Sequence, residues 1–293
     1  MSFSGEVKQE LAKRISPARH CQIAELAALM HFCGDYGQIG ESQGGKPVFT
    51  LGFQTENEAV VRKGFTLLKK TYNIETDRTL EEQEIHGLLA KIGGPGEPVN
   101  PLLIKNSCCR RAFLRGAFLA VGSMSNPAKG YHLEFDCADE AKALFLQKLI
   151  RSFEIESKII LRKKYHVVYL KEGSSIVDLL NVCEAPVSLM NLENMRILKE
   201  MRGAVNRRVN CETANIAKTV TAAAKQVEDI EYLRKYYGFQ NLPETLREMA
   251  EIRLEYPDAP LKELGGYFHP PLGKSGVNHR LRKLSELAEQ ARP

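Results

Sequence analysis

The sequence predicts an α+β fold, in which a duplicated αββαββ domain is followed by an all-α helix-turn-helix domain. Two segments, 47–59 and 130–141, alternate apolar and polar residues like half-buried strands and then enter helices. An apolar helical segment that ends on glycine precedes each of them, and residues 261–284 have the pattern helix, turn, helix. The expected domains are 1–184, with repeats over about 20–95 and 108–184, a basic helical connector over 185–238, and a helix-turn-helix domain over 239–293.

The duplication is visible when the two strand-like segments are aligned. Four residues of the first segment then fall on similar residues of the second: Leu51, Phe53, Glu58 and Ala59 on Leu133, Phe135, Glu140 and Ala141. Helices are expected next, over 60–72 and 142–153. Each helix is followed by two further strand-like runs, expected over 75–80 with 84–92 and over 156–161 with 165–171. A duplicated unit is the simplest account of these parallels.

The apolar segments that precede the repeats are rich in small residues. Residues such as Ala28 and Gly116 allow two helix backbones to approach closely, so we expect the two segments to pack together. The segments Leu26–Gly34 and Leu114–Gly122 resemble the LAGLIDADG motif of homing endonucleases, which ends the central helices of such a duplicated fold. In those enzymes the acid just before the last glycine holds the catalytic metal.

The two positions that correspond to this acid are Cys33 and Val121. Phosphodiester cleavage with Mg²⁺ needs hard oxygen ligands, whereas cysteine is a soft ligand and valine offers none. Asp35 lies two residues after Cys33, but the matching residue of the other repeat is Ser123. We therefore expect no enzyme, no catalytic residue, no metal and no cofactor. A metal-dependent DNA endonuclease stays as an alternative function, as does an adaptor that uses this domain for contacts with protein partners.

Composition and cysteine usage fit an intracellular protein. The net charge is +5 and 43% of the residues are hydrophobic, which suits a globular chain with an anionic partner. The seven cysteines are odd in number and lack paired CxxC spacing, so neither a disulfide framework nor a zinc site is indicated. No apolar run has membrane-spanning length. We expect a cytoplasmic, nucleoid-associated protein that has no membrane partner.

The predicted connector is rich in basic residues, which suits contact with a duplex backbone. A solvated connecting helix is the plainer interpretation of the same pattern. Asparagine is a poor helix former, so three asparagines in a short stretch suggest caps or specific hydrogen bonds. The candidate contacts are Asn206, Arg207, Arg208, Asn210, Asn215 and Lys218.

The C-terminal stretch predicts two helices around a turn. A short helix over Leu261–Leu264 leads into Gly-Gly and Pro-Pro, and the second helix begins only after Pro271, because proline cannot continue a helix. A helix over 245–256 is expected to support the pair. The second helix has an apolar stripe formed by Val277, Leu281, Leu284 and Ala288.

The opposite face of this second helix is polar and basic, with no acid between Glu263 and Glu286. In a helix-turn-helix the residues near the start of the second helix reach base edges, so we expect the partner to be double-stranded DNA. The candidates for base readout or close phosphates are Lys274, Ser275, Asn278, His279 and Arg282, and those for backbone contacts are Arg280 and Lys283.

Three phrases of the chain resemble the WhiA family of Gram-positive bacteria: MSFSGEVKQELA at the start, NRRVNCETANIAK from Asn206, and LKELGGYFHPPLGKSGVNHRLRKL near the end. The resemblance implies a degenerate LAGLIDADG-like domain joined to a helix-turn-helix. It also implies a DNA-binding regulator of transcription linked to cell division, chromosome segregation and, in spore formers, sporulation. The family usually has serine where this chain has Gly273, and glycine at a helix start costs only a few tenths of a kcal/mol.

Overall fold

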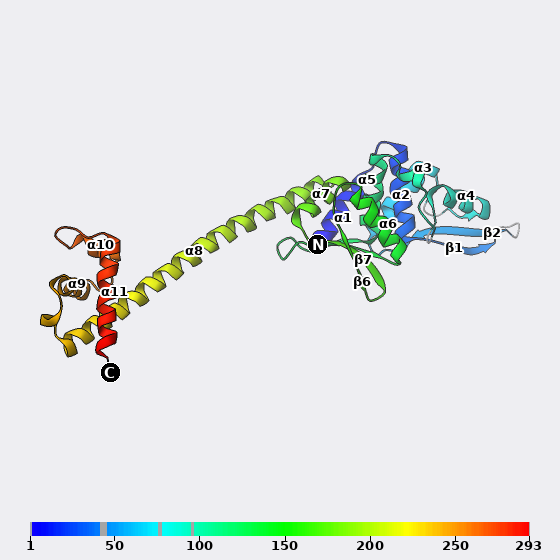
Figure 1. The fold of residues 1–293 in the computed structure, drawn as a ribbon. Coiled ribbons are helices and arrows are strands. Elements are labelled where there is room, and N and C mark those ends of the chain that lie inside the picture. The colour runs from blue at the N-terminus through cyan, green and yellow to red at the C-terminus, as the bar shows by residue number, and fades with distance from the viewer. Residues whose placement is uncertain (1, 42–45, 76–77, 95–96, 293) are drawn as a thin grey trace. The chain divides into compact units, whose positions relative to one another are not determined.

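The computed structural model describes residues 2–41, 46–75, 78–94 and 97–292 (Figure 1). The chain forms two compact units, Met1–Lys199 and Glu200–Pro293, each with its own apolar core. Over the described ranges, none of the helices combines the length and the apolar character that crossing a membrane requires.

Two helices of equal length form the centre of the first unit. Helix α2 (Arg19–Cys33) and helix α5 (Ser107–Val121) pack along each other, and each ends at a glycine (Figure 1). A Cβ atom on Gly116 would lie 2.5 Å from the carbonyl oxygen of Glu25, so only glycine permits this approach. The expectation that the two small-residue segments pack together is confirmed.

Each repeat contributes an antiparallel sheet. The first sheet has the order β1-β2-β3 and the second the order β4-β5-β7-β6. Gly34 pairs with Phe53 in the first sheet and Gly122 pairs with Phe135 in the second, so both repeats use the same register. The duplication is thereby confirmed. The strands are β1 (Gly34–Glu41), β2 (Pro47–Phe53), β3 (Leu80–Glu81), β4 (Gly122–Met124), β5 (Leu133–Cys137), β6 (Lys158–Arg162) and β7 (Tyr165–Leu170).

The remaining helices of this unit pack around the central pair. Helix α3 begins at the side chain of Asn57 and helix α6 at the side chain of Asp139, which both accept backbone hydrogen bonds as N-caps. The helices are α1 (Phe3–Lys13), α3 (Glu58–Tyr72), α4 (Glu82–Ile92), α6 (Glu140–Arg151) and α7 (Gly173–Cys183), with a short 3₁₀ helix over Pro101–Ile104.

The first repeat departs from the predicted pattern after α3. Residues 84–92, expected as a strand, lie in helix α4, whose start is fixed by reciprocal hydrogen bonds between Glu81 and Glu84. The buried residues of α4 recur at helical rather than alternating spacing: Ile85, Leu88, Leu89 and Ile92. The strand expected over 75–80 reduces to β3, and residues 76–77 lie outside the described residues. In the second repeat both predicted strands are present, as β6 and β7.

Helix α8 (Pro186–Tyr232) contains the boundary between the two units, at Lys199 and Glu200. The connector predicted over 185–238 is therefore shared between the units. Its asparagines lie within an unbroken helix, so the expectation that they act as caps was wrong. Asn215 donates instead to the sulfur of Cys211 over 3.7 Å, one helical turn away.

The second unit is all α, as predicted. Helices α9 (Glu244–Glu255), α10 (Leu261–Gly266) and α11 (Lys274–Ala291) pack on the end of α8. The predicted apolar stripe of α11 is at most 1% exposed. Gly265 fixes the turn between α10 and α11, because its carbonyl accepts from the Leu272 amide over 2.9 Å and a Cβ atom would lie 2.0 Å from the Leu272 oxygen.

Candidate nucleic-acid interface

The face of α11 opposite the buried stripe carries six of the seven side chains predicted for DNA contact, and all six are exposed: Lys274, Ser275, Asn278, His279, Arg282 and Lys283. The helical period explains this arrangement, since burial of the stripe turns the intervening positions outward. Gly273 occupies the N-cap in extended conformation and supplies no side-chain hydrogen bond. The backbone amides of the first turn consequently lack a side-chain acceptor at this position.

Arg280 has a different environment from the other six residues. Its guanidinium lies 5.0 Å from the ring centre of Phe268 and donates to the carbonyl of Thr245 over 3.4 Å. Glu248 lies 3.8 Å away and balances the charge. These contacts join α11 to α9 and to the turn, so the geometry gives Arg280 a structural role within the unit.

Arg282 donates from Nε to Oε1 of Glu286 over 2.9 Å, one turn further along α11. The Arg282 side chain is 79% exposed. An exposed pair of this kind contributes little stability, so the guanidinium can exchange Glu286 for another acceptor at small cost.

A hollow of about 420 Å³ lies beside the start of α11, within the second unit. Basic side chains from three elements line it: Lys218 from α8, Lys262 from α10 and Lys274 from α11. Asn278 lines the same hollow. The structure thus brings one predicted connector residue next to two predicted residues of α11. Lys262 was missed by sequence reasoning, although its place beside the turn could have suggested it.

Arg253 forms part of the wall of this hollow and is 2% exposed. Its Nε and Nη2 atoms donate to Oε1 of Gln226 over 3.1 and 2.7 Å, and Nη1 donates to the carbonyls of Pro257 and Ala259. Burial lowers the pKa of this guanidinium, and Asp258 opposes the effect. Arg253 therefore fixes α9 against α8 beside the basic hollow.

The other predicted connector contacts lie along α8 and are exposed, but they do not line the hollow. Arg208 donates from Nε to Oε1 of Glu212 over 3.1 Å. Asn206, Arg207, Asn210 and Asn215 occupy the same exposed part of the helix. Among the residues that the structure describes, Lys218 is the one connector candidate that lines the hollow together with residues of α11.

The structure also shows the two positions that correspond to the metal-binding acids of the homing endonucleases. Cys33, at the end of α2, is 7% exposed, and burial raises the pKa of its thiol to about 11. Val121 ends α5 and is half-buried. Asp35 lies exposed on β1, and Ser123 on β4 donates to Glu134 over 3.4 Å. Neither helix end therefore presents a carboxylate at the position where the motif would hold a metal.

Metal-ligand atoms gather instead at the opposite ends of α2 and α5. Within the described ranges, the group of three or more such side chains consists of His20, Cys21, Cys108 and Cys109. The two halves of this group come from different repeats. Paired CxxC spacing does not indicate this group, because no local spacing in the sequence connects its two halves.

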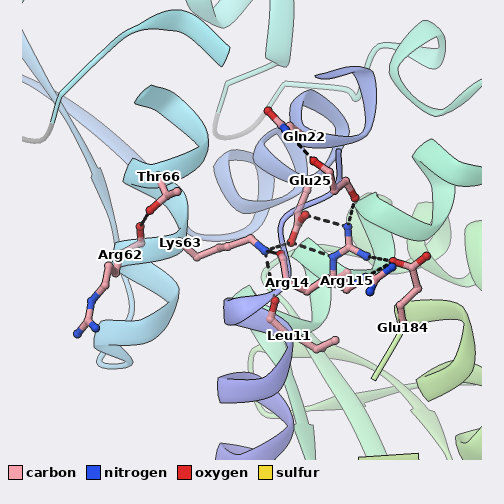
Figure 2. Close-up of polar contacts among 10 residues, drawn as sticks. Leu11, Arg14, Gln22, Glu25, Arg62, Lys63, Thr66, Arg115 and Glu184 are labelled. Carbon is pink, nitrogen blue, oxygen red and sulfur yellow. Dashed lines mark hydrogen bonds and ion pairs between the residues drawn. The ribbon is translucent and has the colours of Figure 1, made fainter. Parts of the chain in front are cut away.

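A buried ionic network also lies between α2 and α5 (Figure 2). Glu25 is 0% exposed and accepts from Arg115 twice and from Lys63 Nζ over 2.9 Å. Arg115 also donates to Glu184 over 2.6 Å and to the hydroxyl of Ser16 over 2.9 Å. Sequence reasoning missed the network, although charged residues inside two apolar helices were the available signal.

Three family models match the chain in succession. They are the WhiA N-terminal LAGLIDADG-like domain over residues 19–84, the WhiA LAGLIDADG-like domain over 110–202, and the WhiA C-terminal HTH domain over 205–288. The order of these matches agrees with a duplicated α+β unit followed by a helix-turn-helix.

Curated relatives match along the whole chain. The chain is 50% identical to the probable cell division protein WhiA of Lachnoclostridium phytofermentans, with 100% of both chains covered. It is 47% identical to the protein of the same name from Alkaliphilus oremlandii, with 98% of this chain and 97% of that protein covered. The crystal structure of full-length WhiA from Thermatoga maritima is similar with a TM-score of 0.59 at 26% identity, and 100% of both chains is covered. The chain therefore belongs to the WhiA family.

Proposed function

We propose that this chain is a DNA-binding regulator of transcription that acts in cell division and chromosome segregation, and in sporulation where the host forms spores. The observation that carries the DNA-binding part is the exposed, acid-free first half of α11 beside the hollow lined by Lys218, Lys262 and Lys274. The names of its relatives, probable cell division proteins, support the cellular role. Such a role belongs in the cytoplasm, on the nucleoid.

In the proposed complex, α11 enters the major groove with its N-terminal half toward the bases. Asn278 has the amide geometry that pairs bidentately with adenine, and Arg282 has the fork that pairs with guanine or holds a phosphate. Lys274, Ser275 and His279 lie on the same exposed face. Lys283 follows further along the helix, where the phosphate backbone would pass.

The basic residues of the hollow would position the duplex rather than read it. Lysine side chains neutralise phosphates and release counterions, which gives affinity that depends on salt and not on sequence. Lys218 comes from α8 and Lys262 from α10, so two elements besides α11 contribute to this positioning. The exposed residues of α8 from Asn206 to Asn215 would extend the contact along the backbone.

The proposal assigns no catalysis to the chain. Cys33 and Val121 supply no hard oxygen ligand for Mg²⁺, and the ends of α2 and α5 carry no acid in their place. We assign the first unit to protein contacts instead. Prolonged incubation of supercoiled and linear DNA with Mg²⁺ or Mn²⁺ should give no nicking, whereas nicking abolished by Asp35→Ala would contradict this part.

The deciding experiment is capture of fragmented host genomic DNA by the purified full chain, followed by sequencing and footprinting of the strongest site. The double variant Asn278→Ala, Arg282→Ala should lose these sites, with a weakening of about 10- to 100-fold for each lost base contact. Arg247→Ala removes an exposed arginine of α9 and serves as the matched control. Unchanged site selection by the double variant would overturn the proposed readout.

A further inference from the structure

Four metal-ligating side chains occupy equivalent places in the two repeats. Helix α2 begins at Arg19, so His20 and Cys21 are its second and third residues. Helix α5 begins at Ser107, so Cys108 and Cys109 are its second and third residues. The internal duplication thus places one pair of ligands at the start of each central helix.

The packing of the two helices brings these pairs together. Cys21 and Cys109 are 5% and 3% exposed and form a small buried cluster with Ala24 and Ala112. Alanine at both positions allows the helix starts to approach, just as Gly116 does further along α5. His20 and Cys108 are exposed on the outer side of this cluster. Two ligands therefore lie in the core and two lie at the surface, where an ion can enter.

The ligand atoms of the four side chains lie close together. One ligand atom from each of the four residues lies within 4.8 Å of all the others. Nδ1 of His20 is 3.1 Å from Sγ of Cys109 and 3.4 Å from Sγ of Cys21. A tetrahedral zinc ion with Zn–S near 2.3 Å and Zn–N near 2.0 Å separates its ligand atoms by about 3.5 to 3.8 Å. The observed separations of 3.1 and 3.4 Å and the upper limit of 4.8 Å bracket this range.

We propose that His20, Cys21, Cys108 and Cys109 bind one zinc ion that joins the starts of α2 and α5. Three cysteines and one histidine are an established ligand set for structural zinc, and four protein ligands leave no open position for catalysis. On binding, the three thiols release their protons to solvent, and Zn²⁺ with three thiolates and a neutral imidazole carries a net charge of −1. No electron is transferred.

The two helix starts favour this charge. The partial positive charge at the N-terminus of a helix stabilises thiolates within its first turn, and here two fifteen-residue helices direct their N-termini at one site. The site lies outside the predicted DNA interface and in the other unit. The zinc ion would join the two repeats at the starts of α2 and α5. The buried ion pair of Arg115 and Glu25 joins the same two helices further along their length.

The test is the zinc content and affinity of the purified full chain, prepared with reductant and stripped with a chelator before zinc is returned. The wild type should bind one zinc per chain, and Co²⁺ in its place should give the intense visible bands of a tetrahedral thiolate site. Cys108→Ser and His20→Ala change exposed side chains and leave the core intact. Each should lower zinc affinity by more than about 100-fold, because even supporting partners of a ligand contribute 10- to 100-fold.

Cys211→Ser is the matched control, since Cys211 is an exposed cysteine of α8 far along the sequence from the site. This variant should keep wild-type zinc content. Circular dichroism verifies that every variant retains its helices. Zinc well below one per chain in the reduced wild type would overturn the proposal, as would wild-type affinity in Cys108→Ser. A disulfide between Cys21 and Cys109 in a chain that binds no zinc when reduced would identify a redox pair instead.

Discussion

Arg115 of the second repeat donates two hydrogen bonds to Glu25 of the first, from Nε to Oε1 over 3.0 Å and from Nη2 to Oε2 over 2.9 Å. Both side chains are at most 1% exposed. Burial alone would lower the pKa of Arg115, but Glu25 and Glu184 outweigh it and raise that pKa above its usual value. Arg115 therefore keeps its positive charge, and its hydrogen bonds to Glu25 join the repeats between the two central helices.

Arg115→Met should destabilise the first unit by about 3 to 5 kcal/mol, because it leaves the carboxylate of Glu25 buried beside Lys63 alone. The measurement is urea unfolding followed by circular dichroism, since the chain has no tryptophan. Arg78→Met removes an exposed pair with Glu84 and should cost less than about 1 kcal/mol. Equal losses of unfolding free energy for the two substitutions would show that the buried pair contributes no more stability than the exposed pair.

Stability should fall below pH 6.5 because of His31. Burial, assisted by Lys142, lowers the pKa of His31 to about 4, against 6.5 in an unfolded chain. As the pH falls the unfolded chain takes up the proton first, so the stability that His31 contributes is present above pH 6.5. It is lost between pH 6.5 and about 4, in total by about 3 kcal/mol.

The check is the unfolding free energy of wild type and His31→Leu across this pH range. The leucine variant keeps an apolar side chain against Phe32 and Phe145, whose ring centres lie 4.9 and 6.2 Å from that of His31. The difference between the two proteins should change with pH only within the stated window. A difference that stays constant from pH 7 to pH 4 would mean that His31 titrates normally in the folded chain.

Gly265→Ala should destabilise the second unit by about 3 kcal/mol, because the new Cβ meets the carbonyl oxygen of Leu272. Gly266→Ala is the matched control, since a Cβ there meets no atom within 4 Å. The control should be neutral or stabilise α10 by up to about 1 kcal/mol. Thermal unfolding together with hydrogen exchange in α9 and α11 distinguishes the two, and similar losses in both variants would count against this account of the turn.

Lys218→Ala should weaken binding to every duplex and reduce the slope of log K against log salt by about 0.9. The reason is its place beside Lys274 in the hollow, where it would neutralise one phosphate. Lys235→Ala removes another exposed lysine of the same unit that does not line the hollow, and its slope should match the wild type. An unaltered slope for Lys218→Ala would exclude Lys218 from the interface.

The strands that follow the second helix of each repeat were predicted correctly in the second repeat but not in the first, and the local sequence explains the difference. In the second repeat, β6 and β7 are short runs rich in β-branched and aromatic residues, a composition that indicates a strand without reference to the rest of the chain. In the first repeat, the likeness to its partner suggested a strand over 84–92, although the apolar residues there repeat with helical spacing. The local period was correct and the analogy between the repeats was misleading.

The sequence by itself determined the apolar stripe of α11, the duplicated framework and the absence of acids at Cys33 and Val121, because each depends on residue type and local spacing. Only the tertiary structure decided that His20 and Cys21 meet Cys108 and Cys109, that Arg115 meets Glu25 across 90 residues, and that Lys218 lies beside Lys274. Periodicity fixes which face of a helix is buried, but the crossing of two packed helices decides which distant side chains meet.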